Sequence, residues 1–232
     1  MIGGDVVVTV NARSSSRSRR HHAMSAAYDA ARTRRLRLMT RLGDFGAFTA
    51  TIGLALQPFQ RTIVRAAQGP ERELLVLLPR GNGKTTLMAA LAVHHLLTVP
   101  DPAVYVAAAS RDQARVLGEA ARRFARDAGS EHLVIRHDEV RWVSDPEQPR
   151  VAHGHLRVIA SDAPKAHGLT PSLVIVDELH AHADDELYLA LRTAMLKRPG
   201  ARMIVISTAG QGADTPLGQL RARALAQPTV QR

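Results

Sequence analysis

The stretch that decides the fold is PRGNGKTT at residues 79–86, which follows the apolar run ELLVLL at residues 73–78. A short apolar run that ends in turn residues is typical of a strand buried on both faces of a parallel sheet. Residues 85–97 have the length and apolar spacing of a helix. Backbone N–H groups between such a strand and helix converge on one point, as in phosphate-binding sites. The stretch is therefore interpreted as a phosphate-binding loop (P-loop).

Lys84 and Thr85 are the residues of this loop that are expected to carry its chemistry. In P-loops the lysine reaches the β and γ phosphates of a nucleotide, and the following hydroxyl holds Mg²⁺. The usual pattern has a glycine where this chain has Leu78. A Gly-Lys-Thr triplet alone is weak support, so the interpretation depends on a second motif.

The second motif is LVIVDE at residues 173–178. An apolar strand over residues 172–176 brings Asp177 to its carboxyl end, where ligands bind in open α/β sheets. A carboxylate there can hold Mg²⁺, and Glu178 is placed to orient and polarise an attacking water. The alternative is that two adjacent acids form a solvated turn, but a turn rarely follows five apolar residues directly. The catalytic interpretation is favoured.

Strand and helix patterns alternate through the rest of the chain. GDFG at residues 43–46 ends a basic helical pattern over residues 26–42. The further elements predicted are a short helix ending near residues 68–70, strands at 103–109 and 203–206, extended pieces at 133–143 and 155–160, and helices at 111–127 and 184–196. This order predicts an α/β fold of the P-loop NTPase (ASCE, RecA-like) class, with a mainly parallel central sheet flanked by helices.

Small polar residues follow the strand predicted at residues 203–206, in the order Ser207, Thr208, Ala209 and Gly210. Such a segment can sense the γ-phosphate and pass its loss to moving parts. A Ser-Thr pair before a glycine can also simply terminate a strand. The two motifs described above favour the functional interpretation.

The charge of the chain indicates a polyanionic partner. The formal net charge is +10 and the isoelectric point is near 11.1. Arginines that neutralise phosphates release condensed counterions, so nucleic acid is the leading candidate. Because Lys84, Lys165 and Lys197 are the only lysines, a GC-rich coding bias that inflates arginine stays an equal alternative.

Other features limit the class of protein. The chain has no cysteine and no apolar run of about 20 residues, which favours a soluble intracellular protein. The domain prediction is a disordered basic segment over residues 1–25, an ATPase domain over residues 26–215, and a short basic tail over residues 216–232. Histidine pairs occur at 94 and 95, 153 and 155, and 180 and 182, but none has zinc-site spacing, so ordinary surface histidines are expected.

From about residue 43 to residue 210 the chain resembles the ATPase domain of phage large terminase subunits, especially those of tailed phages with HK97-like capsids. Terminases often lack the first P-loop glycine and have an arginine four residues before the lysine, which is Arg80 here. The resemblance implies that Arg80 is a cis-acting arginine finger or nucleotide sensor. The alternative is an arginine that only supports the loop.

The resemblance also assigns an adenine-binding segment over residues 56–61, in which Gln60 reads the base edge and Phe59 packs nearby. The cofactors it implies are ATP and Mg²⁺, with Mg²⁺ at Thr85 and Asp177. The catalytic residues it implies are Glu178, Arg80 and Lys84. The ATP-binding residues it implies are Phe59, Gln60, Arg80, Gly81, Asn82, Gly83, Lys84, Thr85 and Thr86.

In the family, the segment at Ser207, Thr208, Ala209 and Gly210 matches the motif that couples hydrolysis to DNA movement. The implied function is ATP-driven translocation of double-stranded viral DNA into a procapsid. The implied partners are a small terminase subunit, a portal protein and further copies of the chain in a ring, without a membrane, in the cytoplasm of a bacterial host. No cluster of acidic residues follows Gly210, so no nuclease domain or nuclease activity is expected from this chain, which is interpreted as a fragment, half of a split gene or a prophage remnant.

Two other interpretations stay open. The first motor domain of a superfamily 2 helicase shares an upstream glutamine, an Asp-Glu-x-His motif (residues 177–180 here) and a third motif like Ser-Ala-Thr. The missing first P-loop glycine argues against it. A truncated terminase that binds DNA or partners without hydrolysing ATP is the other alternative.

Overall fold

The computed structural model describes residue 33 and residues 42–143, 152–160, 168–182, 184–210 and 212–226. The strands are β1 (Glu73–Leu77), β2 (Ala103–Ala108), β3 (Leu133–Ile135), β4 (Glu139–Val143), β5 (Ala152–Ala160), β6 (Leu173–Asp177) and β7 (Arg202–Ser207). The helices are α2 (Phe45–Thr51), α3 (Pro58–Ala67), α4 (Lys84–Thr98), α5 (Arg111–Asp127), α6 (Glu186–Ala194) and α7 (Pro216–Ala226), with short 3₁₀ turns η1 (Leu179–Ala181) and η2 (Met195–Lys197).

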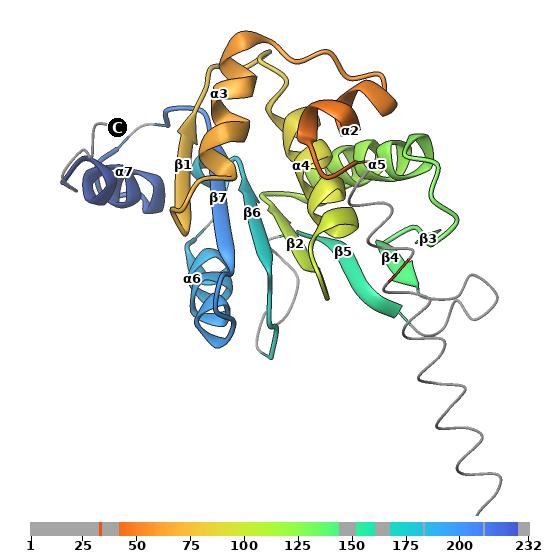
Figure 1. The fold of residues 1–232 in the computed structure, drawn as a ribbon. Coiled ribbons are helices and arrows are strands. Elements are labelled where there is room, and N and C mark those ends of the chain that lie inside the picture. Colours follow the sequence, from red (N-terminus) through yellow and green to blue (C-terminus); the bar gives the residue numbers. More distant parts are fainter. Residues whose placement is uncertain are drawn as a thin grey trace, which may run out of the picture.

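The strands form one seven-stranded sheet in the order β1-β7-β6-β2-β5-β4-β3 (Figure 1). The five strands from β1 to β5 in this order are parallel, and β4 and β3 are antiparallel at one edge. The predicted mainly parallel sheet is therefore confirmed. β7 lies between β1, which leads into the P-loop, and β6, which ends at Asp177, so the segment after β7 emerges between the two motifs.

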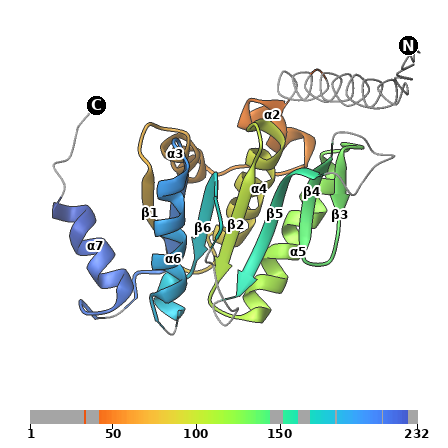
Figure 2. The ribbon, with the colours of Figure 1, turned by 90° about the horizontal axis from the view of Figure 1, so that it is seen from below.

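Helices cover both faces of the sheet (Figures 1 and 2). Side chains of α2 to α5 pack with Val104, Ile175 and Ile204 in one core on one face. Side chains of α6 and α7 pack with Val174, Val176 and Val205 in a second core on the other face. Neighbouring residues of β6 and β7 thus point alternately into the two cores, which explains why these strands are apolar throughout.

The structure corrects several predicted boundaries. GDFG was predicted only to end a helix, but α2 starts within it, because the Asp44 carboxylate accepts the N–H of Ala47 and caps this helix. The extended piece at residues 133–143 is the hairpin of β3 and β4, and β5 starts at Ala152, three residues earlier than predicted. Residues 1–25, most of 26–42, and 145–149 lie outside the described residues, as does Lys165.

The expectation of surface histidines is wrong for His94 and His182, which are buried. The His94 ring lies against Phe45 and Phe48, and its Nε2 lies 3.0 Å from the Leu42 carbonyl oxygen. Burial lowers the pKa of both histidines, because it penalises the charged imidazole. Both rings have a backbone carbonyl partner, which for His182 is the Asp177 carbonyl oxygen at 3.1 Å. No helix within the described residues has the length and apolar character needed to cross a membrane.

Candidate active site

The P-loop joins β1 to α4 and is fixed by its own hydrogen bonds. Gly81 and Gly83 have φ values of +79° and +66°, in the left-handed region that favours glycine. The Asn82 side chain donates to the carbonyl oxygens of Pro79 and Arg80 at 3.1 and 3.3 Å. The loop therefore keeps its shape without a glycine at position 78, and Gly83 is the N-cap of α4.

Lys84 is buried at the first position of α4, with only 6% of its surface exposed. Its ammonium group donates to the carbonyl oxygens of Leu78 and Pro79, both at 3.1 Å. It also lies 3.2 Å from Oε1 of Glu178. A buried ammonium group requires such partners, and the Glu178 carboxylate is its counter-ion.

Thr85 and Asp177 approach each other from α4 and β6. The Thr85 hydroxyl donates to Oδ2 of Asp177 at 3.4 Å, and Asp177 is 2% exposed. Its other oxygen, Oδ1, is buried and has no hydrogen-bond partner among the described residues. Burial, and then the neighbouring Glu178 carboxylate, raise the pKa of Asp177 to about 6. A hydroxyl beside an unsatisfied buried carboxylate fits Mg²⁺, which prefers oxygen ligands.

Glu178 is held above the end of β6 by an unusual backbone conformation. Its φ and ψ are 53° and 52°, left-handed values that a residue with a side chain rarely adopts. Its Oε2 accepts the backbone N–H of Thr208 at 2.9 Å and lies 3.1 Å from Nδ1 of His180. The carboxylate therefore lies between Lys84 on the P-loop side and the segment after β7 on the other.

The segment Ser207, Thr208, Ala209 and Gly210 follows β7 into this site. Ser207 is fully buried, and its backbone carbonyl accepts the N–H of Leu78 at 3.0 Å. On the other side, the N–H of Glu178 donates to the Ile206 carbonyl at 2.8 Å. Backbone hydrogen bonds thus join the end of β7 to both motifs.

A pocket of about 420 Å³ opens at this edge of the sheet. The residues that line it are Arg80, Gly81, Gly83, Lys84, Thr85, Thr86, Gln113, Glu178, His180 and Ala181. The exposed side chain of Arg80 belongs to this lining. The pocket is of a size that holds small ligands, and it brings together residues from the P-loop, α5 and the segment after β6.

Gln60 and Phe59, the two residues predicted to contact the adenine base, differ in their burial. Gln60 is buried; its Oε1 accepts the N–H of Gln57 at 3.0 Å, and its Nε2 donates to the Asn82 carbonyl at 3.2 Å. Phe59 is 37% exposed. Neither residue is among the described residues that line the P-loop pocket. Gln60 supports the P-loop directly, and its contact with a base stays a prediction.

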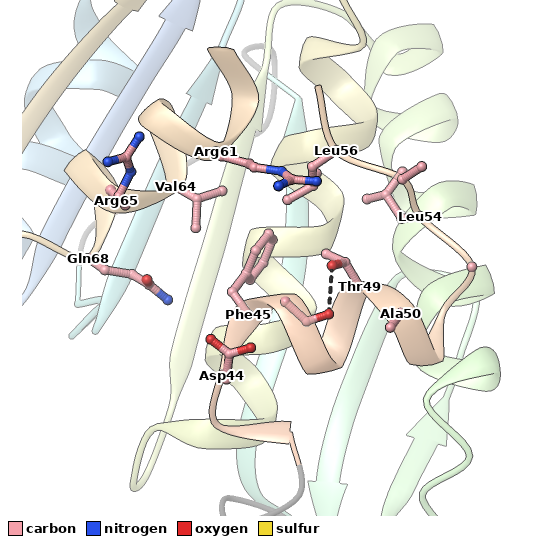
Figure 3. Close-up of a pocket in the computed structure, with 13 residues that line it drawn as sticks. Asp44, Phe45, Thr49, Ala50, Leu54, Leu56, Arg61, Val64, Arg65 and Gln68 are labelled. Atoms are coloured by element: carbon pink, nitrogen blue, oxygen red, sulfur yellow. Dashed lines mark hydrogen bonds between the residues drawn. The ribbon is translucent and has the colours of Figure 1, made fainter. Parts of the chain in front are cut away.

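A larger cavity of about 740 Å³ lies between α2, the segment after it and α3 (Figure 3). Its lining is mostly apolar, with Asp44 at the α2 side and Arg61, Arg65 and Gln68 on α3. It contains no residue of the P-loop and neither Asp177 nor Glu178. The cavity therefore adds no chemical group to the candidate site.

Sequence patterns did not identify two residues that the structure places at the site. Gln113 was given no role, yet it lines the P-loop pocket, and its buried Oε1 has no partner among the described residues. His180 was expected to be a surface histidine, yet it contacts Glu178, Ser207 and Thr208. The Asp-Glu-x-His spacing was the available signal for His180.

A glycine-containing loop between β1 and α4, a carboxylate pair after a parallel strand and a third strand between them define a P-loop NTPase-type fold. A family model described as "Terminase large subunit, ATPase domain" matches residues 65–224, more than half of the chain. The chain belongs to this family, the ATPase domains of terminase large subunits. This membership decides between the terminase and helicase interpretations.

Solved structures agree on the fold. The large terminase of bacteriophage HK97 is similar with a TM-score of 0.64 and 24% identity, over 74% of this chain and 37% of that one. The large terminase ATPase domain of Thermus phage P74-26 has a TM-score of 0.60 and 19% identity, over 71% of this chain and 68% of that one. The chain thus spans about 37% of the length of the HK97 protein. A search of curated proteins found no match.

Proposed function

We propose that this chain hydrolyses ATP to drive double-stranded viral DNA into a procapsid, as the motor part of a phage large terminase. The observation that carries the proposal is the meeting of Lys84, Thr85, Asp177 and Glu178 at one edge of the sheet. The pairing of Lys84 with Glu178 and of Thr85 with Asp177 joins the P-loop to the carboxylate motif. This arrangement supplies positioning and charge, which are what phosphoryl transfer requires of a protein.

Lys84 is assigned to the β and γ phosphates of ATP. Its ammonium group already points to the P-loop carbonyls and to Glu178, so phosphate oxygens would replace Glu178 as its counter-ion. The backbone N–H groups of the P-loop and of the first turn of α4 add donors to the same anion. Binding of ATP would therefore release Glu178 from Lys84.

Thr85 and Asp177 are assigned to Mg²⁺, and the unsatisfied Oδ1 of Asp177 supports this role. An ion held by these two residues would supply positive charge beside the phosphates. Glu178, once released, accepts a hydrogen bond from the attacking water and orients it. Arg80, exposed at the rim of the pocket, is proposed to stabilise charge on the γ-phosphate.

The segment Ser207 to Gly210 is proposed to couple hydrolysis to DNA movement. Its contact with Glu178 through the Thr208 N–H supports this role, because any movement of the carboxylate affects the segment. The DNA partner is supported by the net charge of +10. A small terminase subunit, a portal protein, a ring of copies and a site of action at the procapsid in the host cytoplasm are proposed from family membership.

The test is the ATPase rate of the purified chain with and without duplex DNA, measured beside Glu178→Gln. The expected results are stimulation by duplex DNA and a loss of about 100- to 10,000-fold in Glu178→Gln, with ATP binding retained. The matched control is Glu119→Gln, an exposed residue of α5 paired with Arg115, and its rate should be unchanged. Hydrolysis that survives Glu178→Gln would refute the role of Glu178.

A second variant, Lys84→Ala, tests whether hydrolysis depends on the P-loop lysine. It should abolish hydrolysis, because the phosphate contact is removed. If the unmodified chain binds ATP but does not turn it over with or without DNA, the result supports the alternative of a terminase chain that binds without hydrolysing.

A further inference from the structure

The imidazole of His180 lies where three elements of the site meet. Its Nδ1 lies 3.1 Å from Oε2 of Glu178 and 2.9 Å from the Ser207 hydroxyl oxygen. The Thr208 hydroxyl oxygen lies 3.2 Å from both ring nitrogens. His180 also lines the P-loop pocket. One side chain therefore contacts both the carboxylate assigned to the attacking water and two hydroxyls of the segment after β7.

The chemistry of these partners fixes which ring nitrogen carries the proton. A carboxylate only accepts hydrogen bonds, so Nδ1 must donate to Glu178 for the contact to be favourable. The Thr208 hydroxyl oxygen is equally far from the two ring nitrogens, so it lies against the face of the imidazole. Ser207 also holds the backbone of His180, since its hydroxyl oxygen accepts the His180 N–H at 3.3 Å.

Thr208 contacts both Glu178 and the imidazole beside it. Its backbone N–H donates to Oε2 at 2.9 Å, and its hydroxyl oxygen packs against the ring whose Nδ1 lies 3.1 Å from the same oxygen. Gly210 lies close to the base of the same side chain, because a Cβ added there would lie 3.1 Å from the His180 Cβ. A larger residue at position 210 would therefore press on His180.

We infer that His180 is a positioning residue that fixes the Glu178 carboxylate relative to Ser207 and Thr208. When Lys84 turns to a phosphate, Glu178 loses one of its partners, and Thr208 and His180 remain to orient it. The inference rests on the proposed function, because it takes Glu178 as the group that orients the attacking water. It adds that this orientation depends on the segment after β7 through one imidazole.

The test compares His180→Ala, His180→Asn and His180→Gln. Asparagine can place an amide near the position of Nδ1, whereas glutamine places it near the position of Nε2. The expected result is that His180→Ala lowers kcat for ATP by about 10- to 100-fold, the value of one hydrogen bond to a charged group, with KM and ATP affinity unchanged. His180→Asn should recover most of kcat, and His180→Gln should not.

The control is His137→Ala, which removes an exposed side chain from the turn between β3 and β4 and should leave the rate unchanged. Thermal unfolding of each variant separates a folding defect from a change in kcat. A wild-type rate in His180→Ala, or equal recovery by asparagine and glutamine, would overturn the inference.

A spectroscopic measurement decides the inference even if the chain does not hydrolyse ATP. The ¹⁵N chemical shifts of the His180 ring, recorded where the imidazole is neutral, should show the proton on Nδ1. A proton on Nε2 would overturn the inference. Absence of hydrolysis in the unmodified chain, together with a proton on Nδ1, would instead count against the proposed function and leave the His180 contact established.

Discussion

The antiparallel edge of the sheet and its parallel centre each contain one buried carboxylate, and the two differ in their partners. Glu139 on β4 is 5% exposed, and each of its oxygens is paired with an arginine, Oε1 with Arg141 and Oε2 with Arg157. Asp177 on β6 is 2% exposed, and its Oδ1 has no partner among the described residues. Burial alone therefore does not distinguish a structural carboxylate from a functional one.

The difference follows from where each residue lies on its strand. Glu139 is directly opposite Arg157 in the antiparallel register, and Arg141 lies two residues along on the same face. Asp177 is the last residue of a parallel strand, its register partners are the apolar Ala108 and Ile206, and its side chain meets Thr85 in the first turn of α4. A satisfied buried carboxylate contributes to the fold, whereas an unsatisfied one indicates a ligand.

The largest effect expected is on catalysis. Asp177→Asn should lower Mg²⁺-dependent ATP hydrolysis by about 100-fold or more, because it removes the charged ligand proposed for the ion. Glu139→Gln, measured in parallel, should leave hydrolysis within about twofold of the unmodified chain. Equal losses in the two variants would show that the unpartnered oxygen of Asp177 does not distinguish its role from that of Glu139.

Asp177→Asn should also stabilise the chain when Mg²⁺ is removed by a chelator. The folded-state pKa of Asp177 is about 6, above the unfolded value of about 3.9. The ionised carboxylate therefore destabilises the folded state, and stability is lost as the pH rises from about 4 through 6. The gain in free energy of unfolding should approach about 3 kcal/mol near pH 8 and be smaller near pH 5. Denaturant unfolding at both pH values measures it, and a loss of stability in the variant would contradict the burial argument.

Glu139→Gln should lower the free energy of unfolding, the opposite of the change expected for Asp177→Asn. Two arginines lose their buried counter-ion, but 28% of Arg141 and 49% of Arg157 are exposed, so water replaces part of the interaction. The expected loss in free energy of unfolding is about 2 kcal/mol, the order of a buried hydrogen bond to a charged group. Thermal or denaturant unfolding beside Asp177→Asn shows whether the two changes differ in sign.

The smallest effect is expected at Tyr105, which lies in β2 between the two carboxylates. Its hydroxyl lies 2.8 Å from Nε2 of His155, and burial raises the pKa of its phenol. Tyr105→Phe should cost about 1 kcal/mol of folding free energy, the typical value of one hydrogen bond. ATP hydrolysis should not change, and a large change in rate would extend the functional region toward the antiparallel edge.

Sequence patterns predicted much of the fold because apolar runs mark buried parallel strands independently of their neighbours. They treated residues 43–46 only as a break and missed that α2 begins there, since the capping of α2 by Asp44 outweighs the low helix propensity of Gly46. The candidate residues Lys84, Thr85, Asp177 and Glu178 follow from motif spacing. Gln113 does not, and the Asp-Glu-x-His spacing shows the presence of His180 but not its contacts with Ser207 and Thr208. Both depend on which segments the sheet order brings together, and that order arises from packing between distant parts of the chain.

The position of β7 limits how force can pass through the molecule. β7 is hydrogen-bonded to β1 on one side and to β6 on the other. Sliding it by one residue would turn its side chains to the opposite face of the sheet, so translation along the strand is closed to it. Beyond β7, Gly210 and Gly212 have φ values of +61° and +93°, in the left-handed region that favours glycine, and α7 then packs into the second core. The movement proposed for the segment would therefore have to be a rotation of the chain after Ser207, with β7 held in its register.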